Sequence, residues 1–483
     1  MNRTMSSSVH LDVGLGTETE PVIALSSDDP FRIVLLGDFG GRANRREPRL
    51  LRDPQPLDPD TFEELMERFE TGLELSAGGA PLPIRFRSLD DFHPDHLYDT
   101  LPLFQTLRRT RAQLADPATF RAAAARLQPA PPPVPAPAKP FSGSLLDQIV
   151  DQTAEDAAPA PAPPPDREAS LDEAIRRIVQ PHLLPRPDPR QDELVAQVDA
   201  AASAVMRAIL AHPQFQALEA AWRSAYFLLQ RVETGVELKL NLVDITREEL
   251  AQAALSGLTP CREGWSVAAC LHSFSPSEAD CAVLARLAGI ARQAGGPLFA
   301  GIHPRLMGCE SMAATPDPDD WNQPLDSAAR QAWRQLRGHP DARWIGLAMP
   351  RLLLRLPYGR ATSPAESFDF EEMPQPPDHE SYLWGSPAVA AACLLGQAFN
   401  VRGWRLHPGL RSRLDGLPVH SYRVAGDPRM TPPAETLITD RIAEQILDQG
   451  VMPLASSRSS DSILLVRWQS IADPPSPLAG PWE

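Results

Sequence analysis

The fold is decided by the stretch Trp344-Ile-Gly-Leu-Ala-Met-Pro-Arg-Leu-Leu-Leu-Arg-Leu-Pro-Tyr-Gly359. Its first part, Trp344 to Met349, is an apolar run of strand length that a proline interrupts. Leu352 to Leu356 continues the run, in which Arg351 and Arg355 are isolated charges. An apolar run of this length predicts a buried strand followed by its exit loop.

Segments upstream alternate between strand and helix patterns. Val236 to Asp244 alternates polar and apolar residues at a period of two, as a half-buried strand does. Trp265 to Phe274 and Pro297 to Ile302 are further predicted strands, and Glu278 to Gln293 between them is a predicted helix. This order predicts an α/β fold in which helices cover a parallel or mixed sheet.

A smaller α/β module is predicted at the beginning of the chain. Phe31 to Leu36 is a strand that ends in a glycine-rich turn. A helix with one apolar face begins near Thr61, and residues 95–127 are largely helical by their apolar spacing. We expect residues 31–128 to form a domain of their own, preceded by an N-terminal arm over residues 1–30.

A linker is predicted between the two regions. Pro129 to Pro165 contains twelve prolines, a composition that excludes regular helix and sheet and predicts an extended Pro/Ala-rich segment over residues 129–169. Ser144 to Asp151 interrupts it with one apolar stripe if helical, and Ser144 is a possible N-cap. The stripe consists of Leu145, Leu146, Ile149 and Val150. Residues 170–483 are the second predicted domain.

The short helix has two interpretations, which the sequence leaves open. An amphipathic helix between irregular flanks is a common form of peptide that docks into a groove of a partner. A local helix that packs on its own domain is equally compatible with Ser144 to Asp151, because isolated short helices are marginal in water.

Composition excludes several classes of protein. A formal net charge of −16 disfavours binding to nucleic acid or to an anionic membrane, since both reward a basic surface. No apolar run approaches the roughly 20 residues of a membrane span, and Met1 to Ser8 lacks the apolar core of a secretory signal. We expect a cytoplasmic protein without membrane insertion. We also expect its five cysteines to be reduced, structural thiols.

Three motifs resemble catalytic or metal sites, but the residues around them do not complete such a site. Asp38-Phe-Gly40 matches the magnesium motif of protein kinases, but the glycine-rich loop, strand lysine and catalytic loop are missing. In His93-Pro-Asp-His96 the proline breaks the helical spacing of a metal site and favours a helix-entry turn. Ser386 does not lie in a nucleophile elbow. The sequence therefore predicts a protein that is not an enzyme and has no cofactor or metal.

Five segments occur in one order along the second region: His212 to Arg223, Leu238 to Leu250, Phe368-Asp-Phe-Glu-Glu372, Tyr382-Leu-Trp-Gly-Ser386 and Pro387 to Asn400. With the opening stretch, they resemble the large subunit of the type VI secretion contractile sheath, TssC or VipB. The last similar segment lies at the end of this chain, whereas the sequences of the family continue beyond it. The resemblance implies a large-subunit domain that is shortened at its C-terminus.

The first region resembles the small sheath subunit, TssB or VipA. The resemblance lies in Phe31 to Arg42, Leu57 to Leu75 and Phe86 to Asp95. It implies a natural fusion of small and large subunits, which fixes their ratio at one to one.

The resemblance implies a structural subunit of the type VI secretion sheath, which assembles around the inner tube and contracts to drive effector delivery. The implied partners are further sheath subunits, an Hcp-like inner-tube protein, baseplate proteins and a ClpV-like AAA+ disassembly ATPase. A sheath paralogue that does not polymerise, and acts as cap, adaptor or assembly regulator, is the alternative. The implied localisation is the bacterial cytoplasm.

The resemblance also assigns candidate sites. The stripe of the Ser144 helix is the candidate ATPase-docking element. Neighbouring subunits of the family exchange strands from their chain ends, and the candidate linking strand here contains Val9, Leu11, Val13 and Leu15. The motifs around the opening stretch are candidate interface or core residues, in which the arginines form ion pairs with nearby carboxylates or lie at a solvated strand end. They are Arg351, Arg355, Tyr358, Glu371, Glu372 and Trp384.

Overall fold

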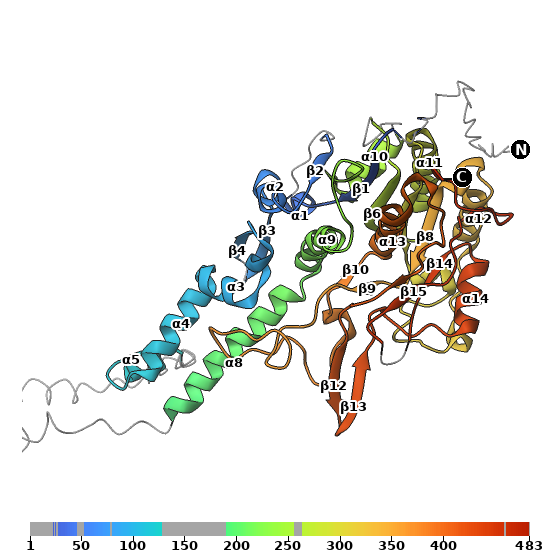
Figure 1. Cartoon of the computed structure of the whole chain (residues 1–483). Helices are drawn as coiled ribbons and strands as arrows, with labels where there is room; N and C mark the ends of the chain where they lie inside the picture. The colour runs from blue at the N-terminus through green and yellow to red at the C-terminus, as the bar shows by residue number, and fades with distance from the viewer. Residues whose placement is uncertain are drawn as a thin grey trace, which may run out of the picture. The chain divides into compact units, whose positions relative to one another are not determined.

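The fold was obtained as a computed structural model, which describes residues 23, 25, 28–45, 53–77, 80–127, 190–255, 263–457 and 460–482 (Figure 1). Two compact units divide the chain: Met1–Leu101 with Ser203–Glu483, and Pro102–Ala202. The candidate linking strand, the Ser144 helix and the Pro/Ala-rich linker lie outside the described residues.

The first unit is built on one mixed sheet of nine strands, as the predicted α/β fold requires. The five pairings from β14 to β5 are all parallel, and the pairings outside them are antiparallel. In spatial order the strands are β11 (Arg413–Leu414), β15 (Ile463–Leu465), β14 (Met452–Ser456), β8 (Ile345–Met349), β7 (Leu298–Ile302), β6 (Val267–Phe274), β1 (Phe31–Gly37), β5 (Leu238–Asp244) and β2 (Gln55–Leu57).

Strand β1 lies inside this sheet, although it comes from the first predicted domain. It pairs in parallel with β5, from Phe31 opposite Leu238, and with β6 on its other side. Six of its seven residues are buried. The small-subunit-like and large-subunit-like parts of the chain therefore share one sheet, and the compact units do not follow the domain boundaries predicted from the sequence.

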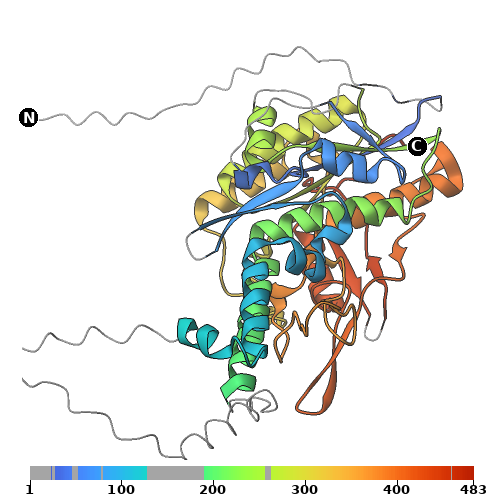
Figure 2. The ribbon, with the colours of Figure 1, turned by 90° about the vertical axis from the view of Figure 1, so that its left-hand side faces the viewer.

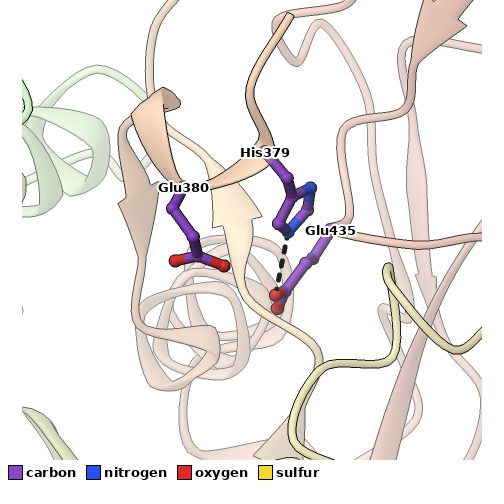
Figure 3. Close-up of side chains that lie close together, drawn as sticks. All are labelled: His379, Glu380 and Glu435. Atoms are coloured by element: carbon purple, nitrogen blue, oxygen red, sulfur yellow. Dashed lines mark hydrogen bonds and ion pairs between the residues drawn. The ribbon is translucent and has the colours of Figure 1, made fainter.

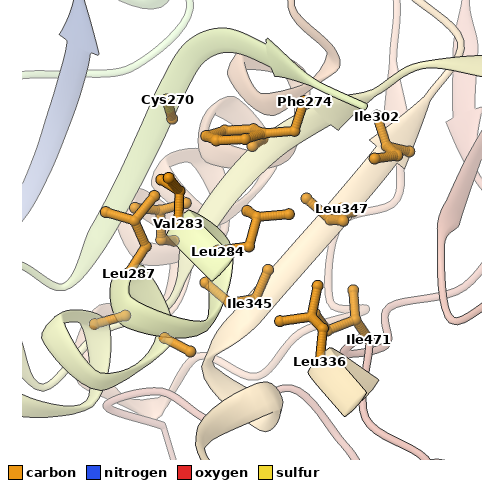
Figure 4. Close-up of a cluster of buried hydrophobic side chains, with 14 of the residues drawn as sticks. Cys270, Phe274, Val283, Leu284, Leu287, Ile302, Leu336, Ile345, Leu347 and Ile471 are labelled. Carbon is orange, nitrogen blue, oxygen red and sulfur yellow. The ribbon is translucent and has the colours of Figure 1, made fainter. Parts of the chain in front are cut away.

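Helices cover both faces of the sheet. One face carries α10 (Arg247–Leu255), α11 (Glu278–Ala294), α12 (Ser327–Arg337) and α14 (Asp440–Asp448). Figure 4 shows Val283, Leu284 and Leu287 of α11 among apolar side chains of β6, β7 and β8. The other face carries α13 (Pro387–Arg402), with α9 (Pro213–Leu229) packed beside it.

Helix α13 is made of small and apolar residues because it lies close to the sheet on a largely buried surface. Ser386 caps its N-terminus by accepting a hydrogen bond from the backbone N–H of Ala388. A Cβ atom at Gly396 would lie 3.0 Å from the Ile33 side chain, so glycine permits this approach of α13 to β1. Phe399, one turn further, stacks on Phe31 with ring centroids 4.5 Å apart.

Three two-stranded antiparallel sheets complete the first unit. They are β3 (Gly72–Ala77) with β4 (Ala80–Arg85), β9 (Leu352–Leu353) with β10 (Trp384–Gly385), and β12 (His420–Val424) with β13 (Asp427–Thr431). The short helices α1 (Arg42–Arg45), α2 (Phe62–Arg68) and α3 (Pro94–Thr100) belong to the same unit. The β12–β13 hairpin extends away from the nine-stranded sheet (Figure 1).

The second unit is a helical cluster of α4 (Pro102–Ala115), α5 (Phe120–Leu127) and the first part of α8 (Arg190–Leu210), side by side in Figure 2. Its core consists of Leu114, Phe120, Ala123 and Val198. In the described part of the chain, no single helix has the length and apolar composition of a membrane span, although α8 and α9 pass that test as a bent pair.

We expect Leu35→Asp to unfold the first unit, because it places a carboxylate in a fully buried strand between two neighbours. The free energy of unfolding should fall by about 4 kcal/mol or more. Leu464→Asp is the matched control, since Leu464 is a strand residue with 44% of its surface exposed. Urea unfolding followed by circular dichroism measures both. Equal midpoints for the two variants would show that β1 is not a core strand.

Candidate functional site

A buried ion network lies beside the opening stretch of the sequence. The guanidinium of Arg355 donates from Nε to Glu219 Oε1 over 2.7 Å and from Nη1 to Glu372 Oε2 over 2.7 Å. Arg223 donates to the same Glu219 oxygen over 2.7 Å and to the Tyr358 hydroxyl over 3.0 Å. We call these five residues the Arg355 network. Glu219 is fully buried, and Arg355 and Glu372 are nearly so.

Three segments distant in sequence supply the Arg355 network. Glu219 and Arg223 lie one turn apart on α9, Arg355 and Tyr358 follow β9, and Glu372 ends the Phe368–Glu372 motif. The pairing of Arg355 with Glu372 matches the ion pair considered from the sequence, whereas Glu219 was missed. A charge among the buried apolar residues of α9 was the available signal, because an isolated buried carboxylate needs a cationic partner.

Burial and neighbouring charges shift the pKa values of Glu219 and Tyr358 in the network. Burial alone would raise the pKa of Glu219, but the positive charges of Arg355 and Arg223 outweigh it and lower that pKa. Burial raises the pKa of Tyr358 to about 12, so its hydroxyl remains a hydrogen-bonding group. The network thus holds three segments together by charge-assisted hydrogen bonds.

A second buried network joins the two sequence regions. Arg42, which is 2% exposed, donates from Nε to Asp244 Oδ2 over 2.8 Å at the end of β5. Its Nη2 reaches the Asp244 carbonyl over 2.9 Å and Glu249 Oε2 on α10 over 2.7 Å. Asp244 Oδ1 also accepts from the backbone N–H of Gly40 over 2.9 Å. This geometry attaches the turn after β1 to β5 and α10.

A third cluster contains a histidine and two glutamates, shown in Figure 3. One ligand atom each from His379, Glu380 and Glu435 lies within 4.8 Å of the others, a spacing that suits a metal ion. Arg351 already supplies the positive charge, however, since its Nη2 lies 2.6 Å from Glu435 Oε1 and 3.3 Å from Glu380 Oε1. We therefore describe the cluster as an ion-pair network and not as a metal centre.

A pocket of about 640 Å³ lies at the carboxyl ends of the parallel strands β1, β6, β7 and β8, an edge where doubly wound sheets bind ligands. Its floor includes the buried residues Leu218, Ala221 and Met349. His272, in its wall, has a pKa that burial lowers, so its imidazole is neutral at pH 7. Arg247, also in its wall, is held by Asp280.

The described cysteines behave as core residues. Cys270, Cys281, Cys309 and Cys393 are all buried free thiols. Burial raises the pKa of Cys270, Cys281 and Cys393 to about 12, so they are protonated near neutral pH and are poor nucleophiles.

The remaining candidate residues lie around these networks. Trp384 is buried and donates from its indole to the His379 carbonyl over 2.9 Å. Glu371 accepts from the backbone N–H of Arg360, whose side chain pairs with Asp369 at the surface. The structure thus brings Arg355, Tyr358 and Glu372 together, and pairs Arg351 with Glu435, which the sequence had not indicated. The ATPase-docking and linking-strand candidates lie outside the described residues.

We expect Arg355→Met to destabilise the first unit strongly, because it leaves two buried carboxylates without their shared cation. Loss of one partner from a buried ion network costs about 3–5 kcal/mol. Arg360→Met is the matched control: its salt bridge is surface-exposed, so its cost should stay within about 0.5 kcal/mol. Thermal unfolding by calorimetry compares the variants, and similar melting temperatures would contradict a structural role for the network.

The stability should also depend on pH through Glu435. Burial alone would raise its pKa, but hydrogen bonds from His379 and Arg351 outweigh burial and lower the pKa from 4.5 to about 2. A lowered folded pKa gives stability that is full above pH 4.5 and is lost as the pH falls toward 2. Unfolding midpoints at a series of pH values should therefore converge for wild type and Glu435→Gln across this window. A constant difference between them would contradict the assignment.

Comparison with known proteins gives matches in both parts of the chain. The VipB model, the tail sheath N-terminal domain of EvpB, matches residues 192–260 and 259–472, and the VipA model of the type VI secretion system matches residues 26–124. The type VI secretion system sheath protein TssC1 of Pseudomonas aeruginosa is 31% identical over 307 residues, covering 59% of this chain and 61% of TssC1. The chain thus spans about three fifths of that relative's length. It belongs to the VipB family of type VI secretion sheath proteins, with a VipA-type small-subunit segment fused to it in the same polypeptide.

Proposed function

We propose that this chain is a protomer of a type VI secretion contractile sheath, with both subunit types in one polypeptide. The observation that carries the proposal is the position of β1. This strand of the VipA-type segment pairs with β5 and β6 of the VipB-type segment, and Arg42 ties its exit turn to Asp244. A single chain can therefore build the paired core that two separate subunits would otherwise share.

The proposed work is mechanical. Protomers assemble around an inner tube in an extended lattice and then contract, which moves the tube outward and delivers effectors. Such a transition changes the packing between rigid protomers, so small differences at each interface add along the polymer. A sheet buried on both faces and buried ion networks suit this role, because the protomer must transmit force without unfolding. No catalytic step is proposed.

The proposed partners follow from this role. They are further copies of the chain, an Hcp-like inner-tube protein, baseplate proteins and a ClpV-like AAA+ ATPase that would bind the stripe at Leu145, Leu146, Ile149 and Val150. Exchange of the strand from Val9 to Leu15 would link neighbouring protomers. The bacterial cytoplasm is the proposed compartment.

The test is negative-stain electron microscopy of the purified chain, alone and with the cognate inner-tube protein. We expect tubules. A variant lacking residues 1–20 should lose long tubules if the linking strand is exchanged, because its lattice contacts are missing. It should still unfold at the wild-type temperature, since the deletion ends before Ile23, whose backbone N–H binds the Gln293 carbonyl.

One outcome would contradict the proposal, and a second would overturn only the linking strand. Monomers or small oligomers under both conditions would assign the chain to the alternative role of a cap, adaptor or assembly regulator. Unchanged tubules from the truncated variant would agree with the sheath function. They would exclude the strand from Val9 to Leu15 as the link between protomers.

A further inference from the structure

The β12–β13 hairpin and the pocket at the sheet edge have complementary surfaces. We infer that the tip of this hairpin on one copy of the chain docks into the pocket of a neighbouring copy, and that this contact links protomers. The inference rests on the proposed assembly of the chain into a polymer. Both features belong to the first unit, so each copy presents a hairpin and a pocket.

The hairpin is held firmly at its base and is exposed beyond it. The Tyr382 hydroxyl lies 2.7 Å from His420 Nδ1 and accepts a hydrogen bond from Thr431 Oγ1 over 2.9 Å. From Arg423 to Arg429 every residue is exposed. A two-residue turn at Ala425 and Gly426, both with positive φ, closes the hairpin. A two-stranded ribbon is marginally stable alone, so a partner that covers this tip would stabilise it.

The tip is basic at its sides and small at its apex. Arg423 and Arg429 outnumber the single carboxylate, Asp427. Val424, with 36% of its surface exposed, and Ala425 form the apex. We refer to residues 423–429 as the hairpin tip.

The pocket lining carries more carboxylates than guanidiniums, the opposite of the hairpin tip. Five carboxylates line the pocket against two guanidiniums. The exposed ones are Glu248, Glu310 and Glu380, of which Glu310 pairs with Arg305 and Glu380 with Arg351. Below the mouth the lining is apolar, with Ile302 and the floor residues given above. An apolar pocket with an acidic mouth fits a partner that has a small apolar apex between basic side chains.

The occupant is assigned to a second copy because the hairpin extends away from the sheet of its own copy (Figure 1). A one-way contact between two different patches of identical chains is heterologous, so it propagates into rings or helical filaments, whereas reciprocal exchange of the hairpins would close a dimer. Propagation is what a sheath protomer requires, whereas a two-fold contact would stop at pairs.

Crosslinking between copies tests the docking directly. In a Cys261→Ser background, one preparation carries Val424→Cys at the hairpin tip and the other Ala217→Cys beside the pocket mouth; the remaining native cysteines are buried. A short bismaleimide should give a crosslinked dimer from the mixture. The control replaces Ala217→Cys with Val236→Cys, which is 88% exposed, precedes β5 and is not a lining residue of the pocket. Equal yields with the two partners would overturn the inference.

A charge exchange adds a second readout. Arg423→Glu alone and Glu248→Arg alone should each lower the crosslinked fraction by about tenfold at limiting concentration, because each places like charges in contact. Combining the two substitutions across the interface should restore most of it. Failure of restoration, with both variants folded by circular dichroism, would contradict the contact.

The outcomes separate this inference from the proposed function. Tubules without specific crosslinks would leave the sheath function intact and exclude the hairpin contact. Specific crosslinks without tubules would support the contact and exclude a self-assembling sheath. A Glu248→Arg variant that keeps self-association but no longer coats the inner tube would assign the pocket to the tube protein and overturn the inference.

Discussion

The pairing of β1 with β5 and β6 is the constraint on which the rest of the structure depends. A parallel strand buried on both faces has no stable place except between two neighbours, because its backbone N–H and C=O groups need partners on each side. Helices on both faces of the sheet pack against β1. Val34 and Leu36 contribute to the core beneath α11, and Ile33 contacts α13 at Gly396. The small-subunit segment is thus part of the core of the large-subunit segment.

The buried ion networks fix how loops and helices meet around this core. Desolvation makes such networks expensive, and an apolar replacement of a whole network is often as stable. Their contribution here is geometric, because Arg355 satisfies Glu219 and Glu372 together only when α9 and the segment after β9 are in one register. Arg42 does the same for the turn after β1 and the end of β5. Each network joins segments that are far apart in sequence, which limits the ways the unit can deform.

A rigid protomer with exposed connecting elements is consistent with a mechanical role. The paired sheet and its two helical layers form the buried part of the unit, while the hairpin that extends from it and the pocket at the sheet edge are the surfaces that we propose to meet neighbours. In a polymer, the free energy of a transition between two packings resides at such surfaces and not in the folded core. Fusion of the two subunit types keeps their contacts intramolecular, so formation of the pair does not depend on subunit concentration.

The sequence by itself determined the α/β class, most strands and helices, and the family, because period-two and helical patterns and ordered motifs are local properties of the chain. Phe31 to Leu36, Trp265 to Phe274 and Glu278 to Gln293 were predicted with boundaries close to those of β1, β6 and α11. Only the tertiary structure decided that β1 lies between β5 and β6, that Glu219 is the partner of Arg355, and that Glu435 is the partner of Arg351. These choices depend on contacts between residues 84 to more than 200 positions apart, and local periodicity carries no information about which distant segments meet.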